Sequence, residues 1–220
     1  KFLRKKTKKL EGKKILISGG AGFLGTYFTE VIAKFNKYIF KKPCKILILD
    51  RFIDKKKKNQ LMKNSFNFKV LDISKKINLN DKYDYIIHAA GIPTPSEYKL
   101  RPIETLDVSY IGTRYLLEIA KKMKAKFVFF SSSEIYGNPD IKNIPTSENY
   151  RGYVSSIGGR SCYDEGKRVG ETLSYLYYEH FGIHTNCIRP FNIYGPGMLQ
   201  TDYRVLPNFA LNILNNKPLR

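Results

Sequence analysis

A tyrosine and a lysine stand four residues apart in the segment Tyr163-Asp-Glu-Gly-Lys167. Within a helix this spacing places both side chains on one face. The ordinary pKa of tyrosine, about 10, is too high for a good base at neutral pH, but a nearby positive charge such as Lys167 favours the phenolate. The pair therefore predicts a general base that takes a proton from an alcohol, with Ser132 hydrogen-bonding the same oxygen.

A glycine-rich turn, Gly19-Gly-Ala-Gly22-Phe-Leu-Gly25, lies near the start of the sequence. It stands between an apolar run at Lys14–Ser18, which predicts a strand, and a helical pattern from Ala21 to Lys34. In this context the backbone N–H groups and the helix N-terminus bind the pyrophosphate of a dinucleotide cofactor. The residues of the turn predicted to contact the cofactor are Gly19, Gly22, Phe23, Leu24 and Gly25.

Two carboxylates, Asp50 and Asp72, follow later strand-like runs. Asp50 is placed to accept hydrogen bonds from the adenosine ribose hydroxyls and to repel a 2′-phosphate, which favours NAD over NADP. Arg51 leaves NADP open, because a neighbouring cation could accommodate the extra phosphate. Asp72 could contact the adenine edge or simply cap the end of its strand.

The fourth strand-like run ends in small residues, Ala89, Ala90 and Gly91, which allow the backbone to approach a dinucleotide closely. His88, just before them, is expected to be structural rather than catalytic. Lys167 is expected to hold the nicotinamide ribose in addition to its role beside Tyr163.

Apolar runs and helical patterns alternate along the chain. The further runs that predict strands are Cys44–Asp50, Phe68–Asp72, Tyr83–His88, Phe127–Ser131 and His184–Arg189. Helices are expected at 108–124, 161–180 and 203–214, and a long irregular stretch at 138–160. This order predicts an α/β fold, with a Rossmann-type doubly wound parallel sheet that binds NAD in residues 1–190 and the start of a small C-terminal substrate lobe in 191–220.

The net charge is +20, from 39 Lys and Arg against 19 Asp and Glu. This charge attracts polyanions, but the clusters at Lys1–Lys14 and Lys55–Lys58 lack the interleaved aromatic residues of a nucleic-acid groove. We therefore expect no nucleic-acid partner, and we expect the charge to help capture an anionic substrate.

Three cysteines, Cys44, Cys162 and Cys187, form no Cys-x-x-Cys pair, which predicts free thiols in a reducing compartment, the cytoplasm. No apolar run is long enough to span a bilayer, so no membrane partner is expected. His180 and His184 have metal-like spacing, but Gly182 separates them at a helix end, so no metal site is expected.

The glycine triad, Ser132, Tyr163 and Lys167 together resemble the extended short-chain dehydrogenase/reductase family over nearly the whole chain. Within that family the likeness is strongest to the UDP-glucuronate decarboxylases. It rests on Ser131-Ser-Ser-Glu-Ile-Tyr-Gly137 and Gly159-Arg-Ser-Cys-Tyr-Asp-Glu-Gly-Lys-Arg168, while Arg189-Pro-Phe-Asn192 fits the family generally.

This resemblance implies a soluble homodimeric enzyme in which NAD oxidises C4 of a nucleotide-linked glucuronate, carbon dioxide leaves, and returned hydride gives UDP-xylose. It implies that Glu134 is an acid/base or positioning group and that Ser133 and Asn192 contact the substrate. It also implies that Arg189 belongs to the cofactor site. The dimer would form through the helices at 108–124 and 161–180.

Three alternatives remain open: a nucleotide-sugar 4,6-dehydratase, a 4-epimerase, or an NAD-binding module without turnover. Dehydratases usually carry Asp-Glu where this sequence has Ser133-Glu134, and epimerases need no glutamate there. Two departures from the family pattern are Ser109, where asparagine is frequent, and Gly197, where decarboxylases commonly have arginine. The family also continues for roughly another hundred residues, so we expect this chain to be a truncated form.

Overall fold

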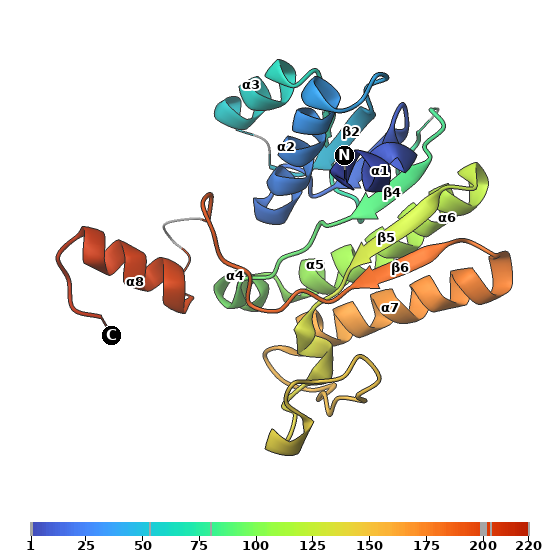
Figure 1. The fold of residues 1–220 in the computed structure, drawn as a ribbon. Helices are drawn as coiled ribbons and strands as arrows, with labels where there is room; N and C mark the ends of the chain where they lie inside the picture. Colours follow the sequence, from blue (N-terminus) through green and yellow to red (C-terminus); the bar gives the residue numbers. More distant parts are fainter. Residues whose placement is uncertain (1, 53, 80, 199–201, 203, 220) are drawn as a thin grey trace.

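Six parallel strands form a single sheet in the order β3-β2-β1-β4-β5-β6 (Figure 1). The computed structural model describes residues 2–52, 54–79, 81–198, 202 and 204–219. The strands are β1 (Lys14–Ser18), β2 (Lys45–Asp50), β3 (Asn67–Val70), β4 (Tyr85–His88), β5 (Lys126–Phe130) and β6 (Thr185–Ile188). The chain starts at the centre and winds outward in both directions, which confirms the predicted doubly wound Rossmann-type sheet.

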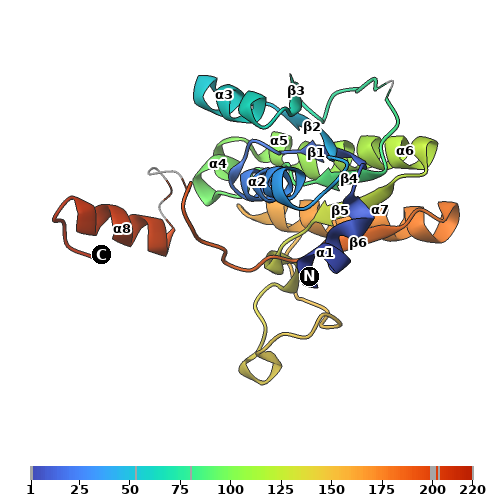
Figure 2. The same cartoon turned by 45° about the horizontal axis from the view of Figure 1, so that its top comes forward.

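Helices connect most of the successive strands and cover both faces of the sheet (Figures 1 and 2). They are α1 (Phe2–Thr7), α2 (Phe23–Tyr38), α3 (Lys55–Lys63), α4 (Pro95–Leu100), α5 (Pro102–Asp107), α6 (Thr113–Met123), α7 (Ser161–Phe181) and α8 (Val205–Leu214). No helix in the described part of the chain is long and apolar enough to cross a membrane.

The central strand β1 shows why both faces need a cover. Leu16 belongs to one buried cluster, together with Leu116 and Leu117 of α6. Its neighbours Ile15 and Ile17 belong to a second cluster, together with residues of α2 and α3. Because successive side chains of a strand point to opposite faces, an uninterrupted apolar run buries both sides of the sheet.

The predicted helix at 108–124 begins earlier than expected, at Pro102, and is interrupted by a π-helical turn at Val108–Gly112. Proline has no N–H to donate and a fixed φ suited to the first helical turn, so it starts α5 well. The π turn buries Ser109, the residue that departs from the family pattern. A Cβ added at Gly166 of α7 would lie 3.0 Å from the Ser109 Cβ, so the absence of a side chain at Gly166 allows α7 to pack closely against Ser109.

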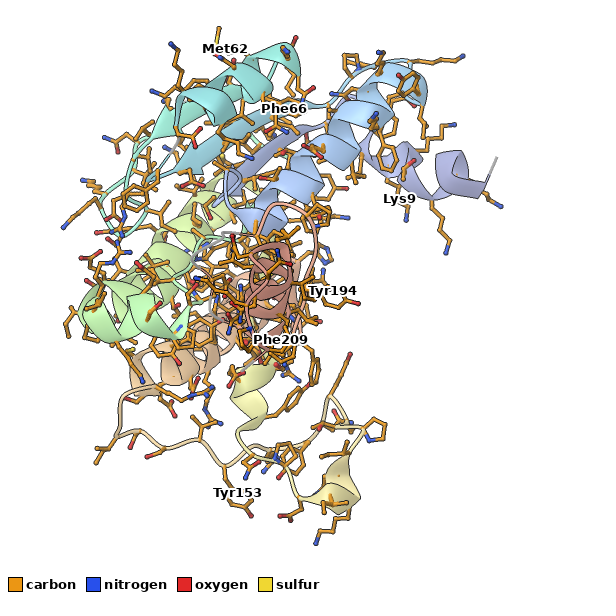
Figure 3. All side chains as sticks on the ribbon, turned by 90° about the vertical axis from the view of Figure 1, so that its left-hand side faces the viewer. Lys9, Met62, Phe66, Tyr153, Tyr194 and Phe209 are labelled. Atoms are coloured by element: carbon orange, nitrogen blue, oxygen red, sulfur yellow. The ribbon has the colours of Figure 1, made fainter. Side chains whose placement is uncertain are left out.

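Residues 138–160 form a long, mostly irregular loop that stands away from the sheet, as predicted (Figure 1). Tyr153 on this loop is almost fully exposed and points outward (Figure 3). After β6 the chain runs back over the start of α2, where Tyr27 donates a hydrogen bond to the Pro196 carbonyl oxygen at 2.8 Å. The last helix, α8, stands apart from the sheet in both ribbon views and contains no buried residue among those described.

Candidate active site

A cleft of about 940 Å³ lies at the carboxyl ends of the central strands. Its walls come from the residues that follow β1, β2, β4 and β5, which is where ligands bind in open α/β sheets. The predicted site residues that line the cleft are Gly19, Gly22, Phe23, Leu24, Gly25, Asp50, Asp72, Ala89, Ala90, Gly91, Ser132, Ser133, Glu134, Tyr163, Lys167 and Asn192. The fold thus brings together all but one of the residues predicted from the sequence.

Two positions of the glycine turn after β1, Gly19 and Gly25, have no room for a side chain. Gly19 has a φ of +73°, and a Cβ on Gly25 would lie 2.1 Å from the Gly19 carbonyl oxygen. Helix α2 begins at Phe23, so its first N–H groups lie beside this bare backbone. The turn therefore leaves the space and the donors that the pyrophosphate of NAD requires.

The two carboxylates predicted at the adenosine end differ in their partners. Asp50 accepts hydrogen bonds from the backbone N–H groups of Ala21 and Phe52, at 3.0 and 3.1 Å. Asp72 accepts hydrogen bonds from the backbone and hydroxyl of Ser74, at 2.9 and 2.7 Å. Burial alone would raise the pKa of Asp72, but these hydrogen bonds and Arg51 outweigh it, so the pKa is lowered and Asp72 is a carboxylate at neutral pH.

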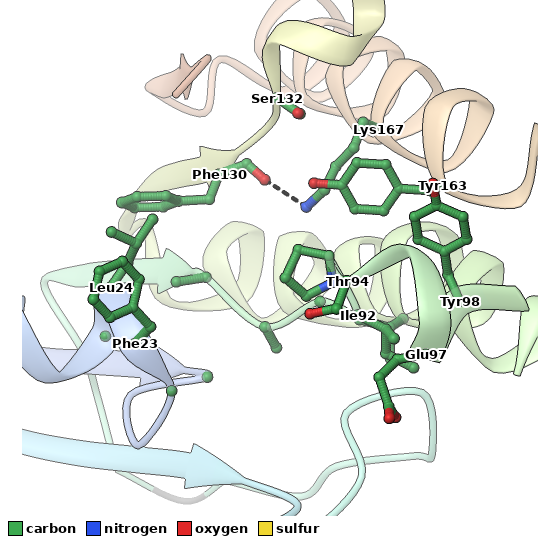
Figure 4. A pocket seen from close by; sticks show the side chains of 18 of the residues that line it. Phe23, Leu24, Ile92, Thr94, Glu97, Tyr98, Phe130, Ser132, Tyr163 and Lys167 are labelled. Carbon is green, nitrogen blue, oxygen red and sulfur yellow. Dashed lines mark hydrogen bonds between the residues drawn. The ribbon is translucent and has the colours of Figure 1, made fainter. Parts of the chain in front are cut away.

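Tyr163 and Lys167 lie on the buried face of α7, as their spacing predicted (Figure 4). The Lys167 Nζ donates a hydrogen bond to the Phe130 carbonyl oxygen at 2.7 Å and lies 5.7 Å from the centre of the Tyr163 ring. The Ser132 hydroxyl accepts a hydrogen bond from the Glu134 N–H at 3.3 Å, and Ser132 lines the same cleft as Tyr163. A phenol, an ammonium group and a hydroxyl therefore meet at the end of β5.

Burial has the largest effect on the pKa values of Tyr163 and Lys167. It raises the pKa of Tyr163, although the Ser132 hydroxyl and the charge of Arg204 act in the opposite direction. It lowers the pKa of Lys167 to about 8. The raised pKa of Tyr163 is opposite to the direction expected from the Tyr163–Lys167 spacing, because the Lys167 amine is turned to the Phe130 carbonyl and burial penalises the phenolate.

Glu134 is paired with Arg160, a residue that the sequence analysis did not single out. The Arg160 Nε also lies 3.5 Å from a carboxylate oxygen of Asp164, one turn further along α7. The other Asp164 oxygen is buried and has no hydrogen-bond partner among the described residues, and burial raises the pKa of Asp164. Arg160 thus stands between two carboxylates at the cleft wall.

Other cleft residues were also missed. Tyr98 of α4 stacks on Tyr163, with ring centres 5.6 Å apart. Arg101 and Arg204 line the cleft as well. With 39 basic residues in the chain, composition gave no sign of which arginines face the site.

Arg189 does not line the cleft, in contrast to the role that the family resemblance implied for it. Its guanidinium forms two bonds with the Glu171 carboxylate, at 2.8 and 2.7 Å. It also donates to the Tyr136 hydroxyl at 2.9 Å and to the Glu148 carbonyl at 2.7 Å. These partners occupy its donors, so in this structure Arg189 ties α7 to the long loop.

His88 is fully buried, in agreement with its expected structural role. Its ring nitrogens lie 2.8 Å from the Ser18 hydroxyl and 3.3 Å from the Val108 carbonyl oxygen. The described residues contain no group of three or more His, Cys, Asp or Glu that could hold a metal ion.

A family model described as "NAD dependent epimerase/dehydratase family" matches residues 15–220. UDP-glucuronic acid decarboxylase 1 of Xenopus tropicalis is 37% identical over 220 residues, which is 100% of this chain and 49% of that protein. The chain therefore spans about half the length of the curated relatives it matches.

Solved structures of similar fold include an epimerase, Mth375, from Methanothermobacter thermautotrophicus. It has a TM-score of 0.80 and 24% identity over 99% of this chain and 63% of its own. UDP-glucuronic acid 4-epimerase from Bacillus cereus, solved with NAD, has a TM-score of 0.70 and 25% identity over 94% of this chain and 65% of its own.

Proposed function

Because this chain belongs to the NAD-dependent epimerase/dehydratase family, we propose that it carries the catalytic half of a UDP-glucuronate decarboxylase. The observation that carries the proposal is the meeting of Ser132, Tyr163 and Lys167 in the cleft, beside a Glu134 held by Arg160. The likeness to a relative of that name over the full chain supports the choice of reaction.

The residues present fit NAD. The glycine turn and the start of α2 would hold the pyrophosphate, Asp50 the adenosine ribose, and Lys167 the nicotinamide ribose. When bound, NAD takes a hydride from the sugar and later returns it.

Tyr163 acts as the base that removes the proton of the C4 hydroxyl, and Ser132 holds the same oxygen through a hydrogen bond. The resulting C4 ketone lies β to the sugar's carboxylate. Loss of carbon dioxide breaks the C5–C6 bond and leaves its electron pair as an enolate, with the charge on the C4 oxygen. Ser132 and the protonated Tyr163 are the donors available to stabilise that oxygen.

A proton must then be added at C5, and Tyr163 must return its proton to the C4 oxygen as the ketone is reduced. We assign the first of these steps, or the positioning for it, to Glu134, whose carboxylate lines the cleft. Ser133 and Asn192 line the same cleft and are proposed substrate contacts. The sum is UDP-glucuronate plus a proton giving UDP-xylose and carbon dioxide.

Dehydration of a hexose is the second candidate, because those enzymes also begin by oxidising C4. That reaction needs an acid to expel the C6 hydroxyl, and the position before Glu134 holds Ser133, which is a poor acid. A 4-epimerase needs neither an acid at the position of Ser133 nor a glutamate at the position of Glu134. These reactions, and NAD binding without turnover, are the outcomes that compete with decarboxylation.

The test is mass spectrometry of the products formed by the protein, at its full native length, with NAD and UDP-glucuronate. A UDP-pentose formed with loss of carbon dioxide, and absent with Tyr163→Phe, is the expected result. Unchanged UDP-glucuronate together with a dehydrated or epimerised product from another UDP- or dTDP-hexose would replace the decarboxylase by that activity. NAD binding with no product from any of these sugars would favour the module without turnover.

We also propose that the protein is a homodimer joined through α5 to α7. Ile103, Tyr175, Tyr178 and Phe181 are large apolar side chains that stay exposed on these helices. The three in α7 recur at a spacing of three residues and so share one stripe of the helix. Light scattering should give twice the chain mass, and Tyr178→Asp should shift the molecule towards monomer; a wild-type monomer at micromolar concentration would refute the dimer.

For location we propose a reducing compartment, the cytoplasm. The support is that Cys44, Cys162 and Cys187 are all free thiols. Labelling of the cysteines in protein purified under non-reducing conditions should find all three reactive after unfolding, whereas a blocked pair would count against this location.

A further inference from the structure

Arg51 follows Asp50 directly at the end of β2, where the adenosine ribose of the cofactor is expected. A guanidinium at this place is well suited to bind the 2′-phosphate that distinguishes NADP from NAD. Arg51 is only partly exposed and lies with its guanidinium 4.9 Å from the centre of the Phe52 ring.

Two carboxylates from other parts of the fold hold Arg51. Its Nη1 lies 2.6 Å from a carboxylate oxygen of Glu104 on α5 and 3.3 Å from one of Asp72, after β3. One guanidinium is thus paired with two carboxylates, and a third carboxylate, that of Asp50, belongs to the preceding residue of the chain. Both contacts fall on Nη1, so a 2′-phosphate placed there would compete with these two carboxylates for the guanidinium and would meet an excess of negative charge.

We propose that Glu104, acting through Arg51, makes the protein select NAD over NADP. Glu104 does not line the cleft, so it is a positioning residue and not a cofactor contact. Asp72 shares the task but also lines the cleft, so a change there would alter the binding of either cofactor. The inference rests on use of the dinucleotide cofactor, not on the decarboxylase reaction.

Lys57 is another cation that lies near the glycine turn in the described part of the chain. The Lys57 Nζ of α3 donates a hydrogen bond to the Thr26 hydroxyl at 2.7 Å, in the first turn of α2. A phosphate could reach this amine without any help from Arg51. The experiment must therefore separate the two cations.

The test is titration calorimetry of NAD and NADP with the wild-type protein, Glu104→Gln, Arg51→Met and the double variant. Glutamine keeps the size of the side chain and removes its charge. We expect the wild type to bind NAD far more tightly than NADP. In Glu104→Gln the dissociation constant of NADP divided by that of NAD should fall about tenfold. NADP should bind more tightly, because the released guanidinium forms a charged hydrogen bond with its phosphate.

The double variant should lose that gain, because its phosphate has no guanidinium to bind. Glu165→Gln is the matched control, since Glu165 is a carboxylate of α7 that lies outside the cleft and 3.6 Å from Arg168. It should leave the ratio unchanged. An unchanged ratio in Glu104→Gln overturns the proposal. Tighter NADP binding that persists in the double variant also overturns it, because Lys57 would then bind the phosphate. An equal gain in NADP binding with Glu165→Gln overturns it as well, because the effect would then come from the net charge of the protein.

Discussion

Lys167 donates a hydrogen bond from its buried Nζ to the carbonyl oxygen of Phe130, at 2.7 Å. Phe130 is the last residue of β5, and the next residues are the serines of the site. The bond therefore fixes the helix that carries Tyr163 to the strand end that carries Ser132. It also keeps an ammonium group in a place where water cannot solvate it, at a cost to the stability of the fold.

Because burial disfavours the charged form of Lys167, we expect the stability of the protein to depend on pH. Burial lowers the pKa of Lys167 from 10.5 to about 8 in the folded protein. Between these values the unfolded chain binds the proton and the folded chain does not, so the free energy of unfolding rises with pH from about 8 to 10.5. Lys167→Met should lack this rise, which amounts to at most on the order of 3 kcal/mol in the wild type.

Urea unfolding of both proteins at pH 7 and pH 10 measures the difference. Lys167→Met should gain relative stability at pH 7 and lose that advantage at pH 10, while NAD-dependent activity is abolished at both. Parallel changes in the two proteins would show that Lys167 does not titrate in this window.

Tyr163→Phe should lower kcat by about a hundredfold to ten-thousandfold, which is the usual contribution of a positioned general acid or base to the rate. The dissociation constant of NAD should change much less, because the phenylalanine keeps the ring that stacks on Tyr98. Tyr38→Phe, at an exposed position near the end of α2, is the control and should keep full activity. A Tyr163→Phe variant that retains most of its kcat would mean that another group removes the proton.

The parts of the site that the sequence predicted are those fixed by local pattern. The glycine turn stands between a strand and a helix, and Tyr163 and Lys167 are one helical turn apart, so their places follow from the periodicity of each element. The strand order then brings the ends of β1, β2 and β5 together. For these residues local chemistry and topology agree.

The parts that the sequence did not predict depend on partners distant along the chain. Arg160 meets Glu134 across 26 residues, and Arg51 meets Glu104 across 53. Arg189 follows a strand as the cleft residues do, but its guanidinium turns to Glu171 on the neighbouring helix. Periodicity gives the face of an element, whereas the direction of a long charged side chain depends on which carboxylate lies within reach.

Arg160→Met should lower kcat about tenfold or more, with a smaller change in KM, because Glu134 then loses the cation that orients its carboxylate. Arg160→Lys should keep part of the activity, since lysine has the positive charge but lacks the planar guanidinium group of arginine. Arg168→Met removes a nearby arginine of α7 that lies outside the cleft, and should have little effect. Equal losses in kcat for Arg160→Met and Arg160→Lys, or full activity in both, would contradict a positioning role.

We expect His88 to cause a second pH dependence of the free energy of unfolding, in the acid range instead of the alkaline range. Burial lowers its pKa from 6.5 to about 3, so between these values the unfolded chain binds the proton and the folded chain does not. The free energy of unfolding must therefore fall as the pH decreases from about 6.5 towards 3. His88→Gln removes the titrating group and should show a shallower loss, although lost packing should make it less stable at pH 7 by about 1–3 kcal/mol.

Thermal or urea unfolding at pH 7, 5.5 and 4.5 follows both proteins, with His180→Gln as the control. His180 lies exposed near the end of α7, so its removal should leave the slope of the wild type unchanged. A His88→Gln variant that loses stability as steeply as the wild type would assign the acid sensitivity to the carboxylates of the fold, of which Asp72 and Asp84 both have lowered pKa values. A slope reduced in His88→Gln alone would show that the buried imidazole stays neutral in the folded protein, held between the Ser18 hydroxyl and the start of the π turn.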